Sequence, residues 1–134
     1  MGVCYKSPAA EDDEIKELFS VVQQASKSKN GALIMGDFNF PGINWTTYES
    51  DNHGVEFRDL ILDSYMIQHV MEPTREKNIL DLVLTTNDNM IEKLEVIEHL
   101  STSDHNTICW QFVISGRSQY QERIGSMQEV IMTV

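Results

Sequence analysis

The chain has few of the features that quickly place a protein in a class. It has two cysteines and three prolines in 134 residues. Both cysteines, Cys4 and Cys109, fall on predicted strands, no signal peptide precedes them, and their spacing to the histidines matches no zinc site. We therefore interpret them as reduced thiols in a buried core. No apolar run is long enough to cross a membrane, and we expect an intracellular protein.

Basic residues are also scarce. The chain has 10 lysines and arginines against 21 aspartates and glutamates, a formal net charge of −11. Phosphate contacts are made by Lys and Arg, so this acidic balance disfavours tight affinity for nucleic acid while leaving room for a local basic patch. The hydrophobic share of 41% and the charged share of 23% are ordinary for a globular domain.

The most informative stretch is residues 34–40. The apolar residues 32–35 predict a buried strand, and Gly36 permits an abrupt turn after it. Asp37 and Asn39 then alternate with phenylalanines, so they can share a face at the carboxyl end of the strand, where active sites of α/β sheets often lie. A carboxylate beside a carboxamide suits phosphate chemistry. As a bare pattern, the same residues also form an ordinary tight turn.

A second cluster strengthens the functional interpretation. Asp104 and His105 directly precede a predicted strand over residues 107–114, and Asp81 lies inside the apolar strand predicted over residues 79–84. A buried carboxylate needs a partner, and a histidine is a natural one because the acid fixes the tautomer of the ring. Taken singly, Asp104 could cap a turn, His105 could be a surface imidazole, and Asp81 could serve an exposed sheet edge.

Three motifs follow one another along the chain: Asp37 with Asn39, then Asp81, then Asp104 with His105. In this order they resemble the motifs of the endonuclease/exonuclease/phosphatase superfamily, which includes the DNase I-like enzymes. Their surroundings resemble the endonuclease domain of non-LTR retrotransposon polyproteins, over roughly residues 2–114. The segments that carry the narrower resemblance are residues 3–8, 36–45, 72–75 and 78–86.

The resemblance implies roles for three residues in the first half of the chain. Asp37 matches the aspartate that orients or deprotonates the attacking water, and Asn39 matches the asparagine that contacts the scissile phosphate. Tyr5 matches a tyrosine that borders the same phosphate. Ser7 stands where relatives usually have proline, which leaves the shape of the loop after Tyr5 open.

It implies four further roles in the second half. Asp104 matches a ligand of Mg²⁺ or Mn²⁺, and His105 matches the histidine that faces the phosphate, held by Asp81. Thr74 lies where related nucleases often place a threonine that contacts DNA. The family's metal-binding glutamate has no counterpart here, because the acidic run at residues 11–14 reads as a helix start. We therefore expect an incomplete metal site.

The expected fold class is α/β, a partial two-sheet α/β sandwich of the DNase I-like kind, made mostly of the C-terminal sheet with flanking helices. Residues 1–114 would be a truncated domain lacking its N-terminal half, and residues 115–134 a linker or a frayed helical tail. We expect helices over residues 11–26 and 55–64. We expect strands over residues 2–6, 32–35, 66–70, 79–85, 94–98 and 107–114.

If much of one sheet is absent, apolar side chains of the other should be exposed, and the chain should self-associate through that face. The candidates for this face are Val3, Leu33, Met35, Leu82, Leu84, Ile108, Trp110 and Phe112.

The function that the resemblance implies is a divalent-metal-dependent phosphodiesterase acting on DNA, nuclear if functional, with weak or no activity from this chain alone. Two alternatives stay open. One is a catalytically inactive remnant of a retroelement, and the other is a superfamily phosphatase acting on phosphate esters, against which the retrotransposon-like flanks argue.

Overall fold

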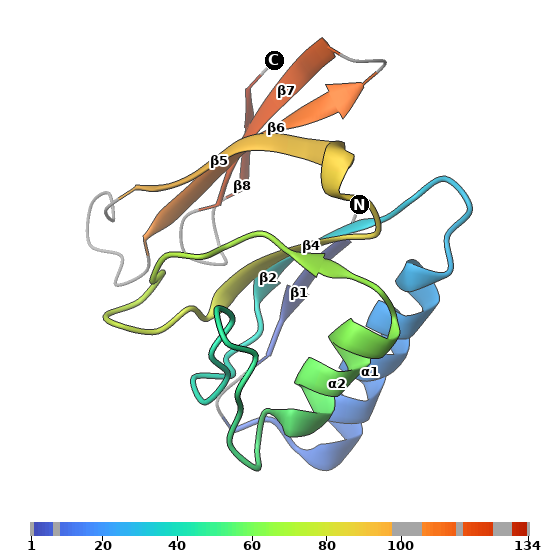
Figure 1. Ribbon diagram of the computed structural model, residues 1–134, viewed down its shortest axis with the longest axis vertical. Helices are drawn as coiled ribbons and strands as arrows, with labels where there is room; N and C mark the ends of the chain where they lie inside the picture. The colour runs from blue at the N-terminus through green and yellow to red at the C-terminus, as the bar shows by residue number, and fades with distance from the viewer. Residues whose placement is uncertain (1, 7–8, 98–105, 115–116, 125–129, 134) are drawn as a thin grey trace.

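The computed structural model of the protein describes residues 2–6, 9–97, 106–114, 117–124 and 130–133, with the backbone alone at 2–5 and beyond 111. Within these described residues, two four-stranded sheets and two α-helices form three layers: the helices, a first sheet and a second sheet (Figure 1). The expected α/β class with two sheets is confirmed. No helix in the described part of the chain is both long enough and apolar enough to span a membrane.

The first sheet has the strand order β1-β2-β4-β3. Strand β1 runs parallel to β2, whereas β4 is antiparallel to both of its neighbours, β2 and β3. The strand expected over residues 66–70 is only two residues long. The bounds are β1 Gly2–Tyr5, β2 Leu33–Asp37, β3 Ile67–Gln68 and β4 Asp81–Thr85.

The second sheet is antiparallel throughout, in the order β5-β6-β7-β8. A short 3₁₀ turn, η1 (Asp88–Met90), leads into it from the first sheet. The bounds are β5 Ile91–Ile97, β6 Thr107–Ile114, β7 Arg117–Ile124 and β8 Val130–Thr133.

The last two strands correct an expectation. A linker or a frayed helical tail was expected over residues 115–134, yet β7 and β8 lie there. The Gln- and Glu-rich composition of residues 117–124 is compatible with a helix. Pairing of this segment with β6, however, satisfies the backbone N–H and C=O groups that β6 would leave unpaired as an edge strand. Strand β7 continues the sheet in antiparallel register, with Ile108 opposite Ile124 and Ile114 opposite Arg117.

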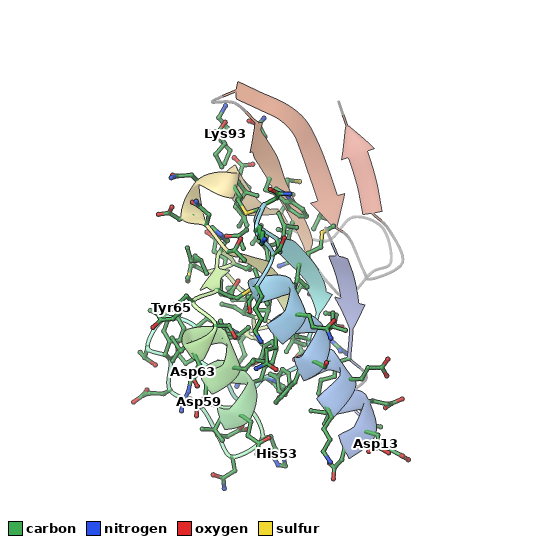
Figure 2. All side chains as sticks on the ribbon, turned by 90° about the vertical axis from the view of Figure 1, so that its right-hand side faces the viewer. Asp13, His53, Asp59, Asp63, Tyr65 and Lys93 are labelled. Carbon is green, nitrogen blue, oxygen red and sulfur yellow. The ribbon has the colours of Figure 1, made fainter. Side chains whose placement is uncertain are left out.

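Helix α1 (Asp12–Ser26) begins where the acidic run predicted a helix start. The backbone N–H of Glu11 donates to the carboxylate of Glu14 at 3.0 Å in a capping box. The negative charges of the first turn stabilise the positive end of the helix dipole, and Asp13 lies at the outer end of α1 (Figure 2).

One core lies between the helices and the first sheet. Phe57 of α2 (Val55–Asp63) is at its centre, with ring centroids 5.3 Å from Phe38 and 4.6 Å from Phe40. Ile34 of β2 and Leu84 of β4 face the same side of the sheet and complete the core. The phenylalanines that alternate with Asp37 and Asn39 therefore anchor the end of β2.

The other core lies between the two sheets, and it overturns the expected exposed face. Strand β2 contributes Leu33 and Met35, which pack with Ile108 and Trp110 of β6. The second sheet thus covers one face of the first sheet, and the helices cover the other. The expected face members whose side chains are described are all buried: Leu33, Met35, Leu82, Leu84, Ile108 and Trp110. The side chains of Val3 and Phe112 lie outside the described part.

Candidate active site

Two buried carboxylates face each other where β2 ends and β4 begins. Asp37 and Asp81 are directly opposite in the antiparallel pair, and they are 6% and 1% exposed. Residues directly opposite one another project from the same face of a sheet. Because side chains alternate along a strand, this is the face on which Leu33 and Met35 meet the second sheet. The carboxylates therefore lie at the end of the core between the sheets.

Asn39 is held at the same end of the sheet by its backbone. The N–H groups of Phe38 and Asn39 both donate to the carbonyl of Leu80, at 2.9 and 3.4 Å. Asn39 has a φ of 51°, in the left-handed region that asparagine tolerates better than most residues. The side chain of Asn39 is half-buried, while Phe38 and Phe40 beside it are buried. The structure therefore gathers Asp37, Asn39 and Asp81 at one edge.

Strand β1 brings Tyr5 alongside Asp37. The two residues are partners in the parallel register of β1 and β2, and the N–H of Lys6 donates to the carbonyl of Asp37 at 2.8 Å. The side chain of Tyr5 lies outside the described part, so its role at the phosphate stays a prediction.

Lys6 is a residue of this site that the sequence analysis missed. Its Nζ donates to the carbonyl of Asn39 at 3.2 Å and lies 4.6 Å from the ring centroid of Phe40. Burial lowers the pKa of Lys6, and the negative charge of Asp37 raises it in part. The only sequence signal was its position directly after Tyr5. The structure thus places one cation next to the carboxylate expected to activate water.

Thr74 corrects another expectation. It is 0% exposed, and its hydroxyl oxygen accepts the backbone N–H groups of Leu80 and Asp81, at 3.0 and 3.1 Å. A residue with no exposed surface does not contact DNA, so the expected DNA contact does not fit. Thr74 instead contacts the start of β4.

Asp104 and His105 lie outside the described residues, so their roles and the expected pairing of Asp81 with His105 remain predictions. Asn106, the next residue in the chain, is described. Its backbone N–H donates to the carbonyl of Thr74, and its Nδ2 donates to the carbonyl of Pro73 at 3.1 Å. The chain at the entry to β6 therefore contacts the loop that leads to Asp81.

A hard divalent cation fits the chemistry of this edge. Mg²⁺ prefers carboxylate and carbonyl oxygens, and Asp37, Asp81 and Asn39 supply such oxygens. The described residues contain no group of three or more His, Cys, Asp or Glu side chains arranged to hold a metal. Asp104, the ligand that the resemblance assigns, is outside them.

His69, the described histidine with a shifted pKa, lies away from the carboxylates. The Nε2 of His69 is 2.7 Å from the hydroxyl of Thr85, at the end of β4 opposite to Asp81. Burial lowers the pKa of His69, and Asp88 raises it in part. His69 is thus a partly buried imidazole that pairs with a threonine, and it does not belong to this site.

Comparison with known proteins identifies the family. Residues 1–109 match the family model described as endonuclease-reverse transcriptase, and this span holds every predicted site residue. The chain belongs to this family. The family lies in the endonuclease/exonuclease/phosphatase, DNase I-like superfamily that the sequence motifs resemble. A search of curated proteins found no relative.

A solved structure shows the same fold. The endonuclease domain of TRAS1, a telomere-specific non-LTR retrotransposon, superimposes with a TM-score of 0.62 at 20% sequence identity. The similarity covers 83% of this chain and 56% of the TRAS1 chain. This chain thus corresponds to a little over half of that structure, and both share the DNase I-like sandwich.

Proposed function

We propose that the edge formed by Asp37, Asn39 and Asp81 is the active site of a divalent-metal-dependent endonuclease that acts on DNA. The observation that carries this proposal is the pair of buried carboxylates facing each other beside a half-buried carboxamide. Two like charges directly opposite one another destabilise a sheet, and buried carboxylates are rare. A functional role therefore explains this pair better than a role in stabilising the fold. Membership of the endonuclease family supports the reaction class.

The residues would divide the chemistry of phosphodiester hydrolysis. Asp37 would accept a proton from the attacking water, and the amide of Asn39 would donate to a phosphoryl oxygen. Lys6 lies close enough to Asp37 for the opposite charges of the two side chains to attract each other. The resemblance assigns His105 to the phosphate and Asp104 to Mg²⁺ or Mn²⁺. A bound cation would neutralise charge that develops on the phosphate.

Plasmid nicking tests this function. We expect residues 1–134, in excess over supercoiled DNA, to nick it slowly in Mg²⁺ or Mn²⁺ and not in EDTA. The change Asp37→Asn should lower the rate about 100-fold or more, because it removes the proton acceptor. Asp63→Asn is the matched control, since Asp63 is exposed on the outer side of α2 (Figure 2). If the folded chain shows no nicking that depends on Asp37, the proposal is wrong for this chain.

A pocket beside the site suggests where the DNA backbone lies. It has a volume of about 330 Å³ and opens between the loop after β2 and the loop before β4. Lys77 is the only charged side chain among the described residues that line it, and Asn44, Asn78 and Thr46 add polar groups. A second pocket of about 450 Å³, beside Asn39, carries Asp12 and Asp51 as well as Lys6. The first pocket suits phosphate better because it lacks carboxylates.

The change Lys77→Gln should therefore weaken DNA binding and lower the slope of log K against log salt by about 0.9, the value for one lost phosphate contact. Fluorescence anisotropy with a short labelled duplex at several salt concentrations measures both effects. Lys16→Gln is the control, because Lys16 is also an exposed lysine and lies on α1, away from this pocket. Equal slopes for the wild type and Lys77→Gln would place the backbone elsewhere.

A further inference from the structure

Thr74 is fully buried, and its polar groups tie together three parts of the chain. Its hydroxyl accepts the N–H groups of Leu80 and Asp81, which begin β4. Its own N–H donates to the carbonyl of Asn78 at 2.9 Å, which closes the loop before β4. Its carbonyl accepts the N–H of Asn106, which leads into β6. One residue therefore joins the first sheet to the second at the candidate active site.

The hydrogen bonds continue from Thr74 to the end of β2. The carbonyl of Leu80 accepts the N–H groups of Phe38 and Asn39. The Leu80 peptide is therefore held through its N–H by Thr74, and through its carbonyl it holds Asn39. A shift of this peptide would move Asp81 and Asn39 together. Phosphodiester chemistry depends on such alignment, because a small misplacement of reacting groups costs a large factor in rate.

The hydroxyl of Thr74 holds the amide of Leu80, just before β4, and the amide of Asp81, the first residue of β4. A valine in place of Thr74 keeps the shape of the side chain but offers no acceptor. Two buried N–H groups would then lose their partner, which is a larger penalty than losing an exposed hydrogen bond. The loop would have to open to water, and the start of β4 would move with it.

We propose that Thr74 is a positioning residue, which fixes Asp81 and Asn39 relative to the entry of β6. It acts through backbone amides and does not contact the substrate. The catalytic consequence rests on the proposed nuclease function, whereas the placement of the backbone can be measured without any reaction. This role replaces the contact with DNA that the sequence predicted for Thr74.

The test compares Thr74→Val with Thr74→Ser and with Thr85→Val. Thr85 is also buried, and its hydroxyl bonds to His69 and to the carbonyl of Asn87 at the far end of the same strand. In Thr74→Val, the amides of Leu80 and Asp81 should exchange with solvent about tenfold faster or more, after correction for global stability. The side-chain amide resonances of Asn39 and Asn106 should also move. Thr74→Ser should behave as the wild type, and Thr85→Val should leave these amides unchanged.

Nicking per folded molecule should fall about tenfold or more in Thr74→Val, in kcat more than in KM, and Thr74→Ser should restore it. Unchanged protection of Leu80 and Asp81 in Thr74→Val, or equal losses in Thr85→Val, would overturn the proposal. Lost protection with unchanged nicking would also overturn it and leave Thr74 a purely structural residue. If the wild type does not nick DNA, the proposed function fails. The positioning role of Thr74 is then tested only by whether the Asn39 and Asn106 resonances move in Thr74→Val.

Discussion

Replacing Phe57 with alanine should lower the free energy of unfolding by about 3–5 kcal/mol. Phe57 is 0% exposed, and its ring contacts four other aromatic rings, at centroid distances of 4.6–6.3 Å. The change removes the burial of a large side chain and leaves a cavity. It also removes the aromatic pairs with Phe38 and Phe40, which hold the end of β2 in place.

Urea denaturation followed by circular dichroism measures this loss. The control is Leu62→Ala on the same helix, because Leu62 is 46% exposed and its truncation should change stability by about 0.5 kcal/mol or less. A total stability of about 5–15 kcal/mol is usual for a domain of this size, so the Phe57 variant would lose a large fraction of it. A loss below about 1 kcal/mol would show that α2 does not hold the sheet.

Local patterns in the sequence predicted much of the first sheet and its helices. The run of residues 32–35 identified β2 because a buried strand needs continuous apolar side chains. The acidic start of α1 identified its first turn through the helix dipole. The alternation of phenylalanines with Asp37 and Asn39 correctly separated Phe38 and Phe40, which pack in the core under the helices, from Asp37, which lies on the opposite face of β2.

Contacts between distant segments could not be predicted in the same way. Strand β7 is polar and carries helix-permissive residues, and β8 is a short apolar segment, so pairing of β7 with β6 and of β8 with β7 makes them strands. The coverage of Leu33 and Met35 depends on Ile108 and Trp110, more than seventy residues away in the printed sequence. The sequence shows that these residues are apolar, but it does not show which sheet they meet.

The same limit applies to the candidate site. Asp37, Asn39 and Asp81 could be predicted because polar residues at the ends of apolar strands converge at a sheet edge. Lys6 and Thr74 could not be assigned their contacts, because these depend on the backbone of Asn39 and of Leu80. A polar residue that bonds to a distant backbone leaves no periodic signal.

Asp81→Asn should separate activity from stability. We expect it to reduce plasmid nicking about 100-fold or more, since the carboxylate expected to orient His105 becomes neutral. We expect it to change the free energy of unfolding by less than about 1 kcal/mol, because asparagine has the shape of aspartate and like charges opposite one another cost about that much. The hydrogen bond from the N–H of residue 81 to Thr74 involves the backbone and is unaffected.

Nicking assays and urea denaturation on the same preparations measure both quantities, with Asp63→Asn as the exposed control. The variants Phe57→Ala and Asp81→Asn should then differ in the property that each one loses. Phe57→Ala should chiefly lose stability, whereas Asp81→Asn should lose its rate and keep its stability. A loss of stability in Asp81→Asn as large as that in Phe57→Ala would mean that Asp81 chiefly holds the fold together. If Asp81→Asn keeps its stability, the charge of Asp81 does not serve folding. Its place opposite Asp37 is then explained by function.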